Sequence, residues 1–195
     1  MKATNIAGAF ILSAWTLGTV AVVWAQQAPA AGGVPESDRK LMVAAASGGL
    51  AEVQMGRLAL QKSSDESVKR HAQHMIDDHS KNNDELKSIA SSKGVTLPTA
   101  PEGKDKALVD KLSGLDGKKF DQAYIREGGV KAHKDMVALL RTAKQQGKSP
   151  ELKQYAEKTL PTVQEHLRES EQMASGKDDA AMRGMNHDAD SKQPH

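Results

Sequence analysis

Apolar residues recur at alternating steps of three and four through most of the chain, which is the spacing of α-helices that bury one face. The stretch from Val68 to Ile89 follows this spacing closely, with polar residues on its other side. The pattern predicts four long helices, over about residues 37–62, 65–93, 119–146 and 150–173.

Residues with known preferences for helix ends mark several of these boundaries. Ser37 or Asp38 is expected to cap the first helix, and residues 63–66 form a capping-box signal for the second. Gly94 is expected to end the second helix. Ser149, followed by a proline, is typical of the start of the fourth.

The segment between the second and third helices, residues 95–118, has a different composition. It contains residues that interrupt helices, around a short helix predicted at 104–112: Pro98, Pro101, Gly103, Gly114 and Gly117. About two dozen residues can extend some 70 Å, whereas a helix of about 27 residues is about 40 Å long. The chain is therefore predicted to be an all-α, ferritin-like four-helix bundle with a long connection between helices 2 and 3, although a compact loop between antiparallel helices also fits.

Each predicted helix carries one side chain of a metal-ligating type near the middle of its apolar face: Glu52, His79, His133 and His166. A buried polar group without a partner costs about 1–3 kcal/mol, so each of the four needs a hydrogen bond or a metal ion. Because all four lie near mid-helix, packing the helices brings them to about the same level. The pattern predicts a buried site for one transition metal ion, with Zn, Cu, Fe, Ni and Mn as candidates.

Other polar residues surround this predicted site. Asp78 is expected to orient a neighbouring imidazole or to join the ligands. His71 and His74 are expected to be flanking or exposed, with His74 paired to Asp78 four residues later. Without a metal, Glu52 could instead pair with a protonated His79 in a buried polar network.

Three backbone irregularities fall near the same level. The glycine pairs at 48–49 and 128–129 each precede a candidate ligand by about one turn, and close helix approach would explain them. Pro161 is expected to kink the fourth helix just before His166, because proline removes one hydrogen bond of the helix.

The two ends of the chain differ from this helical region of residues 37–174. Residues 1–25 have the composition of a signal peptide with cleavage after Ala25, although an uncleaved membrane anchor is the alternative. Residues 26–36 are expected to form a flexible linker and residues 175–195 a disordered tail. The leader predicts a periplasmic or secreted protein, with no membrane span once the signal is cleaved.

Composition excludes several classes of function. The chain has no cysteine, which rules out disulfides, thiolate metal sites, iron–sulfur clusters and covalently attached c-type haem. The net charge is +2 and basic residues alternate with acidic ones, so no nucleic-acid surface is predicted. The tail contains residues that could hold copper weakly, although a solvated tail is the simpler interpretation: Met182, Met185, His187 and His195.

Four short motifs resemble those of the bacterial envelope proteins called domain of unknown function 4142 (DUF4142). They are Glu52 within Ala-Glu-Val-Gln-Met-Gly, Asp78-His79 after Met75-Ile76, Phe120-Asp121 with Tyr124 and then His133, and Leu160-Pro161 with His166-Leu167. The resemblance covers about residues 38–173 and implies a ferritin-like fold and an envelope location. The Glu-x-x-His motif of di-iron bundles is absent, since Ile76, Val130 and Val163 stand three residues before the histidines.

Three functional hypotheses follow. The first is a non-catalytic, metal-binding or stress-related envelope protein that uses Glu52, His79, His133, His166 and Asp78. The second is an interaction or structural bundle whose buried polar residues bond one another. The third, less favoured, is a metalloenzyme, for which the sequence contains no nucleophile–base pair or phosphate-binding loop. Protein partners are not indicated by the sequence.

Overall fold

The computed structural model describes residues 33–176, and this part of the chain contains only helices. The elements are α1 (Glu36–Lys62), α2 (Glu66–Ser92), α3 (Gly103–Ser113), α4 (Gly117–Ala123), the π-helical segment η1 (Tyr124–Ala132), α5 (His133–Gln146) and α6 (Pro150–Ala174). The all-α prediction is therefore correct for the described residues. The predicted signal peptide, most of the linker and the tail from residue 177 lie outside them.

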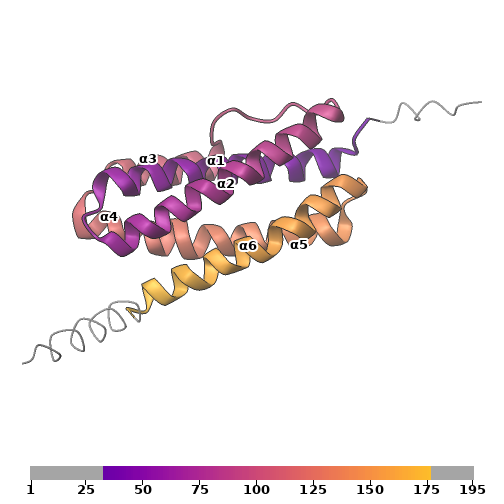
Figure 1. Cartoon of the computed structure of the whole chain (residues 1–195). Helices are drawn as coiled ribbons and strands as arrows, with labels where there is room; N and C mark the ends of the chain where they lie inside the picture. The colour runs from indigo at the N-terminus through magenta and orange to yellow at the C-terminus, as the bar shows by residue number, and fades with distance from the viewer. Residues whose placement is uncertain (1–32, 177–195) are drawn as a thin grey trace, which may run out of the picture. The chain divides into compact units, whose positions relative to one another are not determined.

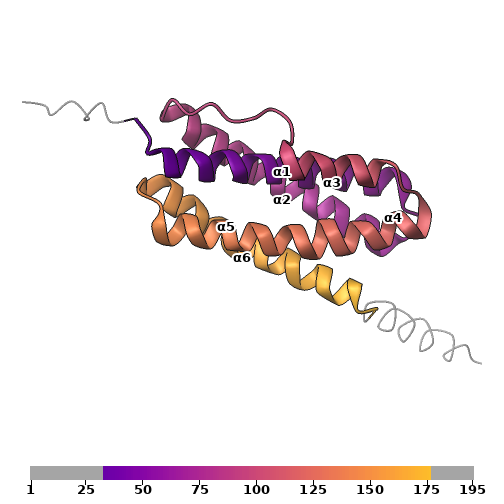
Figure 2. The ribbon, with the colours of Figure 1, turned by 180° about the vertical axis from the view of Figure 1, so that it is seen from behind.

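Four long helical elements pack together as two hairpins (Figures 1 and 2). The first hairpin pairs α1 with α2, and the second pairs α6 with the continuous stretch of α4, η1 and α5. None of the helices in residues 33–176 has the length and apolar character that crossing a bilayer requires.

Contacts at the two ends of α1 fix the direction of the second hairpin. The carboxylate of Asp38, near the start of α1, accepts hydrogen bonds from the backbone N–H groups of Lys148 and Ser149, at distances of 2.7–3.0 Å. Lys62, at the end of α1, donates to the backbone carbonyl of Leu115 over 3.0 Å. The third long helix therefore runs parallel to α2, and the connection between them crosses the bundle from one end to the other.

Short-range hydrogen bonds explain where the helices begin. Ser149 accepts from the backbone N–H of Leu152, so the predicted cap of α6 is present. The cap of α2 is Asp65, which accepts from the backbone N–H groups of Ser67 and Val68, so the helix begins two residues later than the capping box of residues 63–66 predicts. The predicted cap of α1 is wrong, since that helix begins after Pro35 without a side-chain cap. Asp38 is instead fully buried, because its carboxylate is used to hold the turn between α5 and α6.

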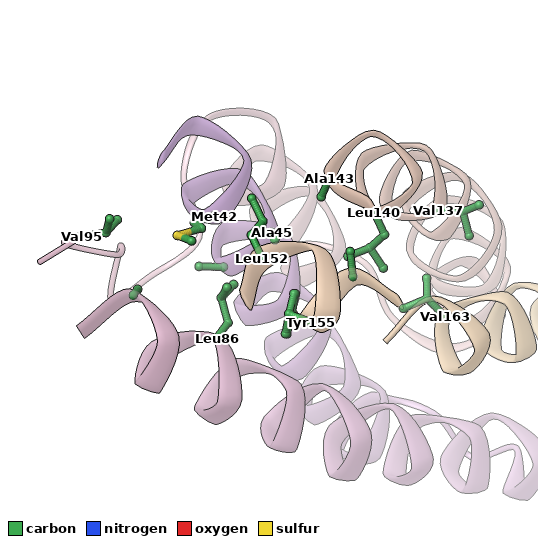
Figure 3. Close-up of a cluster of buried hydrophobic side chains, with 13 residues drawn as sticks. Met42, Ala45, Leu86, Val95, Val137, Leu140, Ala143, Leu152, Tyr155 and Val163 are labelled. Atoms are coloured by element: carbon green, nitrogen blue, oxygen red, sulfur yellow. The ribbon is translucent and has the colours of Figure 1, made fainter. Parts of the chain in front are cut away.

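Two apolar clusters occupy the two ends of the bundle. One gathers side chains from the N-terminal half of α1 and the neighbouring parts of α2, α5 and α6, including Met42, Leu86, Leu140 and Leu152 (Figure 3). The other includes Met55, Val68, Leu112, Phe120 and Tyr124. Along their helices, His79, His133 and His166 lie between these two clusters, whereas Glu52 lies within the second cluster, next to Ala51.

The third long helix buries a different face from the one predicted for its N-terminal half. An unbroken α-helical spacing counted back from His133 predicts that Val130 and Ala123 point inward, but both are only partly buried, whereas Phe120, Tyr124 and Gly128 are buried. The reason is the π-helical segment η1, whose wider turn adds one residue between Gly128 and His133. This extra residue shifts the buried face so that His133 still points inward. In α6 the helix continues through Pro161, and the kink expected there stays a prediction.

Candidate metal site

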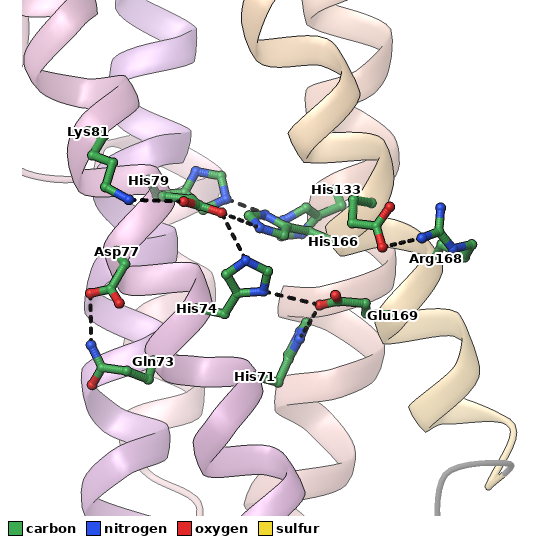
Figure 4. A network of polar contacts seen from close by, with 12 residues as sticks. His71, Gln73, His74, Asp77, His79, Lys81, His133, His166, Arg168 and Glu169 are labelled. Carbon is green, nitrogen blue, oxygen red and sulfur yellow. Dashed lines mark hydrogen bonds and ion pairs between the residues drawn. The ribbon is translucent and has the colours of Figure 1, made fainter.

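Three histidines from three different helices meet in the interior, between the two apolar clusters. His79 of α2 is 2% exposed, and His133 of α5 and His166 of α6 are fully buried. The ring centroids are 5.4–5.6 Å apart, and one ring nitrogen from each residue lies within 4.8 Å of those of the other two (Figure 4). We refer to His79, His133 and His166 as the imidazole triad.

The backbone of the π-helical segment orients the His133 ring. Its Nδ1 lies 3.2 Å from the carbonyl oxygen of Gly128, to which it can only donate. The Nε2 atom is then the unprotonated nitrogen, and it lies 3.3 Å from Nε2 of His79. His133 therefore presents a bare lone pair to the centre of the triad, which is the form that binds a metal ion.

Asp78 orients the ring of His166, as the carbonyl of Gly128 orients that of His133. Its Oδ2 lies 3.2 Å from Nε2 of His166, so a proton on this nitrogen is stabilised by the carboxylate. The other nitrogen, Nδ1, is buried and has no hydrogen-bond partner among the described residues. A buried bare nitrogen without a donor is costly unless it binds something, and this one belongs to a residue of the triad.

Burial keeps the triad neutral. It lowers the pKa of His79 well below the usual value of 6.5, and the neighbouring imidazoles His133 and His166 add to the effect. Burial also lowers the pKa of His133 to about 3, with a further contribution from His166, against the opposing hydrogen bond to Gly128. The pKa of His166 is lowered by burial, which Asp78 partly offsets. Neutral imidazoles are ready to coordinate a metal ion without first losing a proton.

Glu52 lies next to the triad but on its outer side. Its Oε1 is 3.5 Å from Nδ1 of His133, on the ring edge that faces away from Nε2. Burial raises the pKa of Glu52 well above its usual value, and Asp105 raises it further, which favours the neutral carboxyl. The structure thus puts Glu52 beside His133, and not beside His79 as the alternative network had it. Its role as a metal ligand stays a prediction.

Two further histidines line the side of the triad that faces α6. His71 flanks the triad, which is one of the two predicted positions, but it is not exposed: its side chain is buried, with Nδ1 3.3 Å from Glu169 and Nε2 3.1 Å from the hydroxyl of Ser170. The spacing contained a signal, because His71 follows Val68 by three residues on the same helix face. His74 is half-exposed and pairs with Asp78, as predicted, over 3.1 Å.

The fold and this site define an all-helical bundle with a buried histidine cluster. The chain belongs to the family "Domain of unknown function (DUF4142)", whose model matches residues 24–173, so the resemblance inferred from the short motifs is confirmed. No curated protein matches the chain.

Solved structures with the same kind of helical fold have low sequence identity to this chain. A DUF305 fragment from Deinococcus radiodurans aligns with a TM-score of 0.64 and 14% identity, over 73% of this chain and 98% of the fragment. CopM in its Cu(I)-bound and Cu(II)-bound forms aligns with a TM-score of 0.60 and identities of 18% and 17%, over 71% of this chain and 96% of CopM. These likenesses establish a shared helical fold.

Proposed function

We propose that this protein is a non-catalytic bundle of ferritin-like topology that binds one transition metal ion at the imidazole triad. The observation that carries the proposal is the set of three buried, neutral imidazoles whose ring nitrogens converge within 4.8 Å. Two of these nitrogens, on His133 and His166, are left bare because the opposite nitrogen faces a backbone carbonyl or a carboxylate.

The spacing of the two closest nitrogens fits a metal ion. Nε2 of His79 and Nε2 of His133 are 3.3 Å apart. Two nitrogens each about 2.0–2.1 Å from a tetrahedral ion are about 3.3 Å apart, so these two rings need little rearrangement to bind. Three imidazoles leave one coordination position for water, since Glu52 lies on the Nδ1 side of His133.

Donor chemistry narrows the choice of ion. Imidazole suits Cu, Zn, Fe and Ni, and the intrinsic preference of nitrogen sites is greatest for Cu(II) among the divalent ions. CopM, which shares the fold, binds copper in both oxidation states. We therefore propose copper as the first ion to test, with zinc as the main competitor, in a periplasmic or secreted protein as the leader predicts.

The second candidate is a structural or interaction bundle with a closed polar network. It is favoured by one observation, since the two Nε2 atoms at 3.3 Å are also within hydrogen-bonding distance of each other. In that case one of the two imidazoles donates to the other and no ion is needed. This candidate leaves the bare Nδ1 of His166 without a partner among the described residues.

Elemental analysis separates the two candidates. The full-length protein is isolated without an affinity tag, loaded with Cu or Zn and desalted, alongside His133→Ala and the matched control His71→Ala. His71 is also a buried histidine but lies outside the triad. We expect about one retained ion per chain for the natural protein and the control, and loss of the retained ion in His133→Ala. Equal retention in both variants, or none in the natural protein, would contradict metal binding at the triad.

A further inference from the structure

A second group of ligating atoms lies directly outside the triad and shares one residue with it. His74, Asp78 and His166 also offer one ligand atom each within 4.8 Å of the others. Their side chains are 49%, 22% and 0% exposed, so the group leads from the surface to the buried site. Figure 4 shows His74 next to the His166 ring, with a dashed line to Glu169.

The atoms of this group are already arranged around one oxygen. Oδ2 of Asp78 lies 3.1 Å from Nε2 of His74 and 3.2 Å from Nε2 of His166, and the two rings are 5.0 Å apart between centroids. Oε2 of Glu169 is 3.6 Å from Nδ1 of His74, so both ring nitrogens of His74 face a carboxylate, and an ion that binds Nε2 displaces the proton that this nitrogen shares with Asp78. Two imidazole nitrogens and a carboxylate, with open positions for water, suit Cu(II) or Zn(II).

We propose that His74, Asp78 and His166 form an outer site that captures a divalent Cu or Zn ion and passes it to the triad. This proposal rests on the proposed function, because it assigns the outer site the role of loading the inner one. No redox step is involved: the ion exchanges the outer ligands His74 and Asp78 for His79 and His133, while His166 remains within reach throughout.

Because both sites use His166, only one of them can hold an ion at a time. A neutral imidazole has one bare nitrogen and one N–H. When an ion binds Nε2 of His166 in the outer site, the ring proton lies on Nδ1, which then cannot bind a second ion. When the ion moves to the triad, the proton returns to Nε2, which lies 3.2 Å from the carboxylate of Asp78. The ion is therefore transferred, and the two sites do not fill together.

The opposite side of the triad offers an incoming ion a poorer route than the outer site does. A cavity of about 400 Å³ lies there between α1, α3 and α5, and Glu52 lines it. The nitrogen of His133 on that side is Nδ1, which is occupied by the carbonyl of Gly128. No bare nitrogen of His133 faces this cavity, whereas the outer site presents Nε2 of His74 at the surface.

The rate of uptake tests the proposal. Full-length protein is mixed with Zn(II) held by a chromophoric chelator, and uptake is followed in the natural protein, in His74→Ala and in Gln73→Ala, an exposed control one residue away. We expect His74→Ala to load at least about tenfold more slowly, the lower end of what loss of a supporting group costs a metal site. It should retain the same number of ions after desalting, whereas the control should match the natural protein in both respects.

Equilibrium dialysis against Zn(II) gives an independent readout. In His133→Ala the triad is incomplete, and we expect one weakly held ion that is lost on desalting and that disappears when His74→Ala is added. His79→Leu serves the same purpose if His133→Ala does not fold. Uptake by His74→Ala at the control rate, together with no weakly held ion in His133→Ala, would overturn the outer site while leaving the triad intact. Failure of the natural protein to retain any ion would instead contradict the proposed function.

Discussion

The bundle interior contains an apolar layer, which is the cluster that includes Leu140, and an imidazole layer, which is the imidazole triad of His79, His133 and His166. The two layers are built in different ways. The apolar layer around Leu140 consists of side chains that recur at regular helical spacing, and it needs no particular backbone feature (Figure 3). The imidazole layer needs a π-helical segment before His133, a backbone carbonyl from Gly128 and a carboxylate from Asp78. Irregular backbone and buried polar groups both reduce stability, so the imidazole layer is better explained by binding than by folding.

The largest expected difference between the two layers is in how much stability a substitution in each layer costs. Leu140→Ala should lower the free energy of unfolding by about 2–5 kcal/mol, because Leu140 is 1% exposed and its truncation leaves a cavity. The double variant His79→Leu/His133→Leu should cost the metal-free protein less stability than Leu140→Ala, since both partners of the His79–His133 contact are replaced together and only the hydrogen bond from His133 to the carbonyl of Gly128 is lost. Urea unfolding of both variants measures the contrast.

A single substitution serves as the control for this comparison. His79→Leu alone leaves Nε2 of His133 without its partner at 3.3 Å, so it should be less stable than the double variant. If the double variant instead lost as much stability as Leu140→Ala, the imidazole layer would be part of what holds the fold together.

The next largest effect is the gain in stability from a bound ion. An ion that binds only the folded protein adds about 2.7 kcal/mol when its free concentration is 100 times the dissociation constant. The natural protein and Leu140→Ala should gain equally, since Leu140 is not in the triad, whereas His79→Leu/His133→Leu should gain nothing. Thermal unfolding with Cu or Zn, and again after chelation, provides the measurement. An equal gain in the double variant would place the ion elsewhere.

Regular spacing made the fold and most of the site predictable. The four long helices and the inward direction of His79, His133 and His166 follow from steps of three and four. The length of residues 95–118 allowed the crossing connection but equally allowed a compact loop. The spacing could not show which nitrogen of each ring is bare, because a carbonyl and a carboxylate from the folded structure decide this.

The buried face of η1 was missed because the prediction assumed an unbroken α-helix. Phe120, Tyr124 and Gly128 recur every four residues, and His133 follows after five. A five-residue step is the length of one π-turn, so the sequence did contain this signal. Helix propensity does not reveal the π-turn. The glycines at this point are explained by the close packing between helices and not by the turn.

Close packing around the π-helical segment gives the third prediction. A Cβ atom on Gly129 would lie 2.5 Å from the hydroxyl oxygen and 2.8 Å from Cβ of Ser170, so Gly129→Ala should cost about 1–3 kcal/mol of stability. Gly48→Ala is the matched control, because it meets only the flexible end of Met136 and removes a helix-destabilising glycine. Adding Ser170→Gly should recover part of the loss. An unchanged stability of Gly129→Ala, measured by urea unfolding, would argue against tight packing here.

The last difference between the layers is in how stability depends on pH. In the metal-free protein the pKa of His133 is about 3, against an ordinary value of 6.5. Between these values the unfolded chain binds a proton that the folded protein does not, so stability falls as the pH falls below 6.5, by up to about 1.4 kcal/mol per pH unit. The buried His79 adds to this slope in the same direction.

Glu52 changes the pH dependence of stability in the opposite direction to the histidines. The contribution of Glu52 can therefore be separated from theirs. Its pKa is raised above the ordinary 4.5, so the folded protein holds a proton that the unfolded chain releases, and stability is lost as the pH rises from 4.5 through the folded pKa. Urea unfolding between about pH 4 and pH 9 should therefore show a smaller acid loss in His79→Leu/His133→Leu and a smaller alkaline loss in Glu52→Gln. Leu140→Ala should shift the whole curve without changing its slopes, because no titrating group is altered. Parallel curves for all four proteins would mean that water reaches the imidazole layer and that its groups titrate as they do in the unfolded chain.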